Sequence, residues 1–313
     1  VTQATVVAPI LDVETHETLG GICLSLSSDA DEADRVLPAV QSLAAQIASA
    51  LYGARIYEQE LAHESVAREM TLAGEIQANF LPDTLPDVPR WQLTAMLRPA
   101  RETSGDFYDA FTLPDGRLGI LIADVVGKGM GAALFMALSR TLIRTFAVEP
   151  EAEPAPVLAA ANHRILADTH AGLFVTVFYG VLDPRSGALT YANAGHNPAY
   201  LLDAQSGDAI EELERTGVPL GILDGSTWQQ QTVHLSPGAV LMLYTDGITE
   251  AQDAQEGFFD EERLREVARA SLGRSAEETM EAVVARVGAF VGDAPQSDDM
   301  ALVVVVRDSE GSG

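Results

Sequence analysis

The sequence predicts an α+β protein in which antiparallel sheets are covered by layers of helices. Short apolar strands are joined by hairpin signals, "PDG" at 114–116 and "DPRSG" at 183–187. Helical patterns occur in blocks, at 131–146, 155–168, 260–271 and 275–291. Because strands and helices do not alternate regularly, the sequence argues against a doubly wound nucleotide-binding fold and favours a sandwich of helices on sheets.

The chain opens with two expected strands, at 5–11 and 19–26, followed by an acidic stretch and a helix start near Leu37. Apolar residues at three- and four-residue spacing predict one long helix over 36–80, about 68 Å if continuous. The spacing is interrupted at Glu58. The predicted apolar seam consists of Leu37, Val40, Ala44, Ile47, Leu51, Ala54, Leu61, Val66, Met70, Ala73, Ile76 and Phe80.

Such a helix cannot bury its apolar stripe alone. A dimeric coiled coil is therefore the first interpretation, and a helix packed on its own domain is the alternative. Gly53 and Gly74 are points where it could bend or break.

Three prolines within 81–91 end the helix and predict a domain boundary. Beyond it the patterns predict strands at about 92–98, 107–113, 117–123, 173–182, 188–193, 198–202, 231–235, 239–245 and 300–306. These strands and the four helices are enough for one large domain.

Composition narrows the function classes. The chain has 313 residues and a net charge of -27, which disfavours binding to nucleic acid or to an anionic membrane and favours metal ions. Cys23 is the only cysteine, so an internal disulfide is excluded and a reducing cytoplasm is expected. No apolar run reaches the length of a membrane span. The first residue is Val1 and not methionine, so we expect a fragment of a longer protein.

The stretch 119–146 raises the question of a phosphate-binding loop, because Asp124 ends an apolar strand and "GKG" follows it. A Walker loop would need glycine at position 122 and Ser or Thr at 129, where Ile122 and Gly129 stand. The sequence therefore leaves an aspartate at a strand end, followed by a flexible loop into a helix.

Other aspartates stand at strand ends in the same way: Asp106 in "SGDFYDAF", Asp246 in "VLMLYTDG", and Asp298 with Asp299 in "SDDMALVVVV". Each alone is ordinarily a turn or a solvated cap. Together they predict a site for a hard cation, because oxygen ligands without His or Cys select Mg²⁺ or Mn²⁺. Two such ions can activate water and clamp a phosphoryl group.

The motifs "SGDFYDAF", "IADVVGKGMGAALFMA", "YANAGHNPAYLL", "GVPLGI", "LMLYTDGITEA" and "SDDMALVVVV" resemble, in order, those of PPM-type, protein phosphatase 2C-like serine/threonine phosphatases. The chain looks most like the SpoIIE/RsbU branch, over about residues 75–307. The resemblance implies a four-layer α-β-β-α sandwich with two Mn²⁺ or Mg²⁺ ions and hydrolysis by a metal-activated water. Ser104 and Val126 depart from the family, which commonly has glycine and a small polar residue there.

The resemblance also implies roles for individual residues. Asp106, Asp124, Asp246 and Asp298 would be the catalytic aspartates and metal ligands, with Asp124 bridging both ions. The Val125 carbonyl would be a further ligand, and Asp299 ranks below Asp298 within its pair. Candidates for substrate binding are Arg101, weighed evenly against a surface role, and His196, for which a structural role in its turn is the stronger alternative. Lys128 could approach the phosphate, but an exposed lysine in a glycine loop is more often solvated, so it is not among the main candidates.

A weaker resemblance concerns the start of the chain, which is similar to the end of a GAF sensor domain running into a signalling helix. Three parts are therefore expected: residues 1–53 as the C-terminal part of a GAF-like domain, 54–84 as a helical linker, and 85–308 as the phosphatase domain. The implied substrate is a phosphoserine or phosphothreonine of an anti-anti-sigma factor with a STAS fold or a similar phosphoprotein, and a homodimer through the linker helix is expected.

Two other function classes were weighed. A pseudo-phosphatase would have lost at least one of the carboxylates, and none is missing. A metal-dependent phosphodiesterase or nuclease is disfavoured by the negative charge and the lack of basic clusters.

Overall fold

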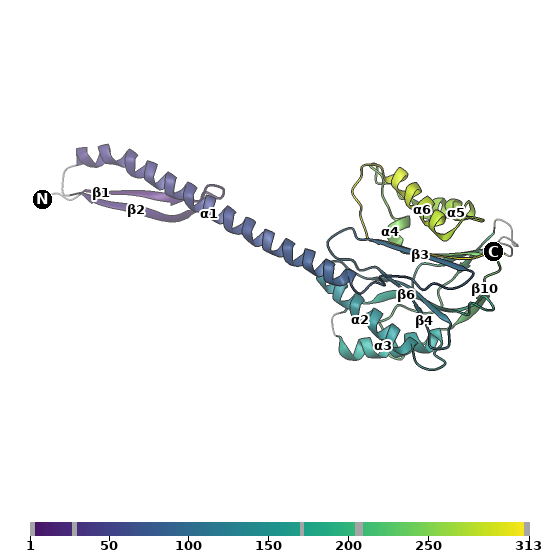
Figure 1. Ribbon diagram of the computed structural model, residues 1–313. Coiled ribbons are helices and arrows are strands. Elements are labelled where there is room, and N and C mark those ends of the chain that lie inside the picture. Colours follow the sequence, from purple (N-terminus) through teal and green to yellow (C-terminus); the bar gives the residue numbers. More distant parts are fainter. Residues whose placement is uncertain (1–3, 27–29, 170–171, 204–208, 310–313) are drawn as a thin grey trace. The chain divides into compact units, whose positions relative to one another are not determined.

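The computed structural model describes residues 4–26, 30–169, 172–203 and 209–309 (Figure 1). The chain divides into two compact units, Val1–Glu69 and Met70–Gly313. The helix α1 (Ala30–Ala78) contributes residues to both.

The N-terminal unit is a hairpin packed on a helix. Strands β1 (Ala4–Leu11) and β2 (Thr18–Leu26) pair antiparallel, as predicted. Helix α1 begins at Ala30 instead of near Leu37, so the sequence-based start was too late. It starts within the acidic stretch, where negative charge is compatible with the positive end of the helix dipole.

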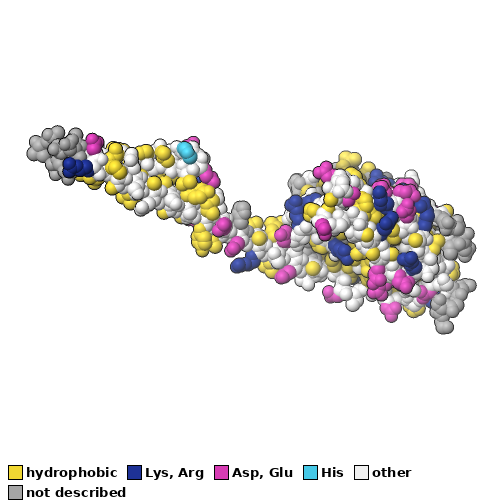
Figure 2. Space-filling model, turned by 90° about the horizontal axis from the view of Figure 1, so that it is seen from above, with side chains coloured by type: hydrophobic (Ala, Val, Ile, Leu, Met, Phe, Trp, Pro, Cys, Tyr) yellow, Lys and Arg dark blue, Asp and Glu magenta, His cyan; other side chains and the backbone are white. Residues whose placement is uncertain are grey.

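The hairpin covers only part of the apolar stripe of α1. Val6 and Ala8 of the hairpin and Val40 and Ala44 of the helix form a small buried cluster. Further along the predicted seam, in contrast, side chains lie at the surface of this chain, with Leu51 half-exposed at 50%. Figure 2 shows hydrophobic side chains exposed on the N-terminal unit.

The second unit contains two five-stranded antiparallel sheets. The first sheet has the strand order β10-β7-β6-β5-β4. Its members are β4 (Phe107–Thr112), β5 (Leu118–Val125), β6 (Val175–Leu182), β7 (Ala188–Ala194) and β10 (Gln231–His234).

The second sheet has the order β3-β12-β11-β8-β9. Its members are β3 (Trp91–Arg98), β8 (Ala199–Leu202), β9 (Ile210–Leu213), β11 (Val240–Tyr244) and β12 (Met300–Arg307). Of these strands, only β9 was not predicted, because two adjacent glutamates in "IEEL" interrupt any apolar strand pattern.

Two pairs of helices pack on these sheets (Figure 1). Helices α2 (Met130–Ala147) and α3 (Pro154–Asp168) contact the first sheet, and α5 (Asp260–Arg269) and α6 (Ala276–Val291) contact the second. The short helix α4 (Asp246–Thr249) follows β11 directly.

The hydrophobic core has three parts. One joins α2 and α3 to the first sheet and another joins α5 and α6 to the second. The third contains side chains of both sheets, such as Ile120 and Phe178 of the first and Leu241 and Val303 of the second. The sheets therefore face each other, and residues at the ends of strands from both can meet at one edge. Among the described residues, no helix has the length and apolar character required to cross a membrane.

Candidate metal centre

The predicted aspartates come from both sheets. Asp106 directly precedes β4 and Asp124 lies near the end of β5, both in the first sheet. Asp246 opens α4 after β11, and Asp298 lies just before β12, both in the second sheet. The charge of Asp246 acts on the pKa of both first-sheet carboxyls, and the charge of Asp298 acts on the pKa of Asp124. Carboxylates next to the two sheets therefore interact electrostatically where the sheets face each other.

Asp106 is the most deeply buried of the group, with 3% of its surface exposed. Its Oδ2 atom is buried without a hydrogen-bond partner among the described residues. Burial raises the pKa of Asp106 well above its usual value, and the charge of Asp124 raises it further. A hydrogen bond with the Thr245 side chain acts in the opposite direction and lowers this pKa. A buried, unpartnered carboxyl oxygen is unfavourable unless a cation approaches it.

Asp124 and Asp246 share this electrostatic environment. Burial, followed by the charge of Asp246, raises the pKa of Asp124 to about 6. Burial also raises the pKa of Asp246, and the charge of Asp298 adds to that effect. Asp246 therefore makes Asp124 harder to ionise and Asp298 does the same to Asp246, whereas a hydrogen bond with Asp106 lowers the pKa of Asp124. A bound cation would relieve the repulsion between these carboxylates.

Asp298 is more exposed and already has a cationic partner. The Nζ atom of Lys128 lies 3.0 Å from Asp298 Oδ1, and both side chains are about two-fifths exposed. Lys128 also donates a hydrogen bond of 3.0 Å to the carbonyl oxygen of Ser297. The expectation that Lys128 is merely solvated was wrong. The signal in the sequence was its place in the "GKG" loop directly after Asp124.

Asp299 has a different set of contacts. Its Oδ1 accepts a hydrogen bond of 2.7 Å from the backbone of Ala100, and its Oδ2 accepts one of 2.8 Å from the backbone of Gly105. Both oxygens therefore hold the loop between β3 and β4, which supports ranking Asp298 above Asp299 as a ligand.

The same loop carries Arg101, which is exposed. Gly105, at the far end of the loop, packs closely against the Val125 carbonyl oxygen: a Cβ atom at position 105 would lie 2.8 Å from that oxygen. Loop 100–105 therefore carries Arg101, packs against the Val125 carbonyl oxygen through Gly105, and leads directly into Asp106.

His196 is buried and uses both ring nitrogens. Its Nε2 lies 3.1 Å from the carbonyl oxygen of Tyr244, which can only accept, so this nitrogen carries the proton. The Thr176 hydroxyl then donates to Nδ1 over 2.8 Å. Burial lowers the pKa of His196 to about 4, so the ring is neutral at pH 7. This bonding leaves no ring nitrogen for a phosphate and favours the structural alternative.

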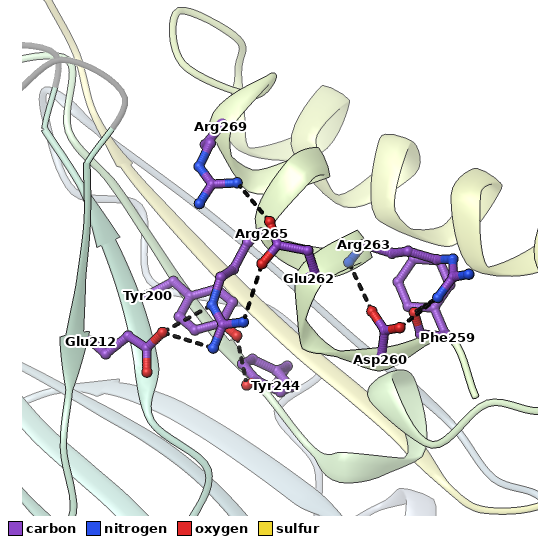
Figure 3. Close-up of polar contacts among 9 residues, drawn as sticks. All are labelled: Tyr200, Glu212, Tyr244, Phe259, Asp260, Glu262, Arg263, Arg265 and Arg269. Atoms are coloured by element: carbon purple, nitrogen blue, oxygen red, sulfur yellow. Dashed lines mark hydrogen bonds and ion pairs between the residues drawn. The ribbon is translucent and has the colours of Figure 1, made fainter.

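A cleft of about 560 Å³ adjoins the centre and has Asp246 in its wall. Its other side is formed by residues of β8, β9 and α5. Figure 3 shows Arg265 in this wall, between Glu212 at 2.9 Å and Glu262 at 3.6 Å and over the ring of Tyr200. The cleft is large enough for several side chains of a protein substrate.

The candidate side-chain metal ligands of this centre are carboxylate oxygens. Within the described ranges, no three His, Cys, Asp or Glu side chains form a group that could hold a metal ion as they stand. The chemistry of the donors nevertheless suits a hard cation: carboxylates next to both sheets act on one another's pKa, and one buried oxygen of Asp106 lacks a hydrogen-bond partner among the described residues. Lys128 is paired with Asp298.

Two facing antiparallel sheets, each covered by a pair of helices, are the fold of protein phosphatase 2C-like domains. The SiaA-PP2C domain of Pseudomonas aeruginosa has this fold, with a TM-score of 0.69 and 24% sequence identity over 79% of this chain and 99% of that one.

Within that class, the chain belongs to the family "Stage II sporulation protein E (SpoIIE)", whose profile matches residues 114–308. Protein IcfG of Synechocystis sp. is 34% identical over 76% of this chain and 41% of its own length. Phosphoserine phosphatase RsbU of Bacillus subtilis is 29% identical over 78% of this chain and 71% of its own length. The matched region thus spans only about two-fifths of IcfG.

Proposed function

We propose that this protein is a metal-dependent phosphatase that hydrolyses phosphoserine or phosphothreonine in a partner protein. The observation that carries the proposal is the meeting of acidic strand ends from both sheets around a buried, unpartnered oxygen of Asp106. The similarity to RsbU, a phosphoserine phosphatase, supports the choice of substrate. The arrangement of two helix pairs on two facing sheets supports the four-layer α-β-β-α sandwich expected for this class.

We further propose that Asp106, Asp124, Asp246 and Asp298 hold two Mn²⁺ or Mg²⁺ ions, with Asp124 between them and the Val125 carbonyl as a further ligand. When bound, such ions supply positive charge that polarises water and the phosphoryl group. The chain itself contributes burial, which keeps bulk water from screening these charges. Asp299 is proposed to act through the loop that it holds.

For the substrate, we propose that the exposed Arg101 binds phosphate oxygens, because a guanidinium can donate two parallel hydrogen bonds to them. The polypeptide next to the phosphoresidue would occupy the cleft beside Asp246. His196 would keep the end of β11 in place through its hydrogen bond to the carbonyl oxygen of Tyr244.

The partner proposed is a STAS-type anti-anti-sigma factor or a similar phosphoprotein, in a cytoplasmic setting. The N-terminal residues 1–53 are proposed to be the end of a GAF-like domain and 54–84 a signalling linker. The exposed apolar positions of α1 support a homodimer through this helix.

The dimer has its own test. Leu51→Asp places a charge on the exposed stripe without touching the acidic centre. Light scattering should show a fall from dimer to monomer, and phosphatase activity should change with it. A chain that is monomeric before the substitution would remove this part of the proposal.

The activity is tested with p-nitrophenyl phosphate and a phosphoserine peptide in the presence of Mn²⁺. Asp246→Asn should abolish turnover of both substrates. Asp293→Asn, at an exposed position after α6, is the matched control and should leave turnover unchanged. No turnover by the wild-type protein, or equal turnover by Asp246→Asn, would contradict the proposed function.

A further inference from the structure

The loop of residues 100–105 joins the two sheets at the acidic centre. It leaves β3 of the second sheet and enters β4 of the first, directly before Asp106. Arg101 and Glu102 are exposed, whereas residues 103–106 are buried. A connection with an exposed tip and a buried end has to be fixed by specific contacts if its tip is to keep one position.

One fixing contact comes from the last turns of α1. The buried side-chain amide of Gln77 accepts a hydrogen bond of 2.9 Å from the backbone N–H of Ser104 and donates one of 2.5 Å to its carbonyl oxygen. Gln77 thereby satisfies both backbone groups of one residue, as a neighbouring strand would. This contact does not need a particular side chain at position 104.

The helix also approaches the loop very closely at Gly74. A Cβ atom at position 74 would lie 1.9 Å from the carbonyl oxygen of Glu102, so only glycine fits there without movement. The glycine interpreted from the sequence as a weak point of the helix is therefore a packing position against this loop.

The second fixing contact comes from β12. Asp299 accepts hydrogen bonds from Ala100 and from Gly105, at the two ends of the loop. At the end next to the site, the Ser104 hydroxyl lies 3.0 Å from the backbone nitrogen of Asp106, which donates to it. The hydrogen bonds thus run from Gln77 through Ser104 to Asp106.

We propose that Gln77 and Asp299 are positioning residues that fix loop 100–105, and that through it they set the position of Asp106 and of Arg101. Neither residue has to touch the substrate for this role. The proposal rests on the proposed function for the meaning of Asp106 and Arg101, but the contacts themselves do not depend on it.

The role also makes the end of α1 a point of control. Gln77 lies on the same helix as the exposed apolar stripe, so a shift or rotation of the last turns of α1 would move Ser104 with it. The donor and acceptor of one amide require one orientation of the helix relative to the loop.

The test uses the whole chain with Gln77→Ala, and Asn79→Ala as the matched control. Asn79 is an amide two residues further on, just past the end of α1, and its side chain donates to the backbone carbonyl oxygen of Glu75 over 3.1 Å. Three quantities are measured: amide hydrogen exchange at residues 100–106, binding of Mn²⁺ alone by calorimetry, and kcat and KM for a phosphoserine peptide.

Gln77→Ala should expose the Ser104 amide to exchange and weaken Mn²⁺ binding about tenfold, as loss of an outer contact of a ligand typically does. KM for the peptide should rise as well, because Arg101 is no longer held. Asn79→Ala should change none of the three.

Gln77→Glu gives a second, independent arm. The carboxylate can still accept from Ser104 N–H but cannot donate to its carbonyl oxygen, so exchange and Mn²⁺ binding should be impaired while the helix keeps a side chain of the same size. Asp299→Ala should raise exchange at Ala100 and Gly105, at the other contacts of the same loop.

Unchanged exchange at Ser104 together with unchanged Mn²⁺ affinity in Gln77→Ala would overturn the proposal. A merely structural role would lower the melting temperature but leave the Mn²⁺ affinity and KM of the folded fraction unchanged, which would also overturn it. A wild-type chain without phosphatase activity would refute the proposed function alone, because exchange and Mn²⁺ binding report on the loop without turnover.

Discussion

The two halves of the acidic centre contain the same residue type in different electrostatic states. In the half from the first sheet, Asp106 and Asp124 are buried and their pKa values are raised. In the half from the second sheet, Asp298 has Lys128 and Asp299 has two backbone donors. The comparison indicates that the charge state of an aspartate at a strand end depends on the groups that contact it. In the part of the chain that the structure describes, no ion pair involves Asp106 or Asp124, whereas Lys128 partly neutralises the second-sheet half at Asp298. Asp246 of that half still has a pKa raised by burial.

The largest expected effect comes from removing the charge of the first-sheet half. Asp124→Asn should lower kcat/KM about a thousandfold or more, because several kcal/mol of transition-state stabilisation by the metal would be lost. The same change should not destabilise the metal-free protein, since it removes a buried charge that its neighbours repel. Steady-state kinetics and urea unfolding in EDTA check the two parts, and a destabilised but active variant would contradict both.

The free energy of unfolding should depend on pH differently for the contributions of His196 and of Asp124. Its pKa falls from 6.5 to about 4 on folding, so its contribution is fully present above pH 6.5 and is lost as the pH falls to 4. The loss is worth about 3 kcal/mol. Urea unfolding of the metal-free protein and of His196→Gln should differ in this window, and parallel acid profiles would argue against a buried neutral ring.

The contribution of Asp124 to the free energy of unfolding should change with pH in the opposite direction to that of His196. Its pKa rises from 3.8 to about 6 on folding, so its contribution is favourable below pH 3.8 and is lost as the pH rises to 6. Without metal, the loss should be about 3 kcal/mol. Asp124→Asn should flatten this limb of the urea profile, and addition of Mn²⁺ to the wild-type protein should offset it.

The smallest effect is expected in the second-sheet half. Lys128→Ala removes an ion pair whose two side chains are about two-fifths exposed, so the free energy of unfolding should change by less than about 1 kcal/mol. Because Lys128 also offsets the charge of Asp246, its loss should raise the pKa of Asp246. If Lys128→Ala changed the free energy of unfolding as much as His196→Gln does, the expected difference between the two halves of the centre would be contradicted.

Much of the fold could be predicted from the sequence, and the reason is physical. The strands of the two sheets are short apolar runs separated by turn residues, and α2, α3, α5 and α6 carry a helical period over 10 to 18 residues. The helix α4 is a single turn, which is too short for a helical period to appear, and the strand β9 contains two adjacent glutamates that hide its strand pattern.

The site could be predicted as a set of residue types but not as a set of contacts. The aspartates could be predicted because each lies at the end of an apolar strand pattern. The contacts of Lys128, Gln77 and Asp299 join residues more than 20 positions apart in the sequence, and no local pattern encodes such pairs. His196 was ambiguous for the same reason, because its partners lie on β6 and β11.

The most direct test of the central claim is a calorimetric titration of Mn²⁺ into the metal-free protein, with Asp124→Asn and Asp293→Asn beside it. Saturable binding to the wild type and to Asp293→Asn, with binding lost in Asp124→Asn, is the predicted result. Absence of binding to the wild-type chain, or equal binding by all three proteins, would contradict a metal centre built from these aspartates.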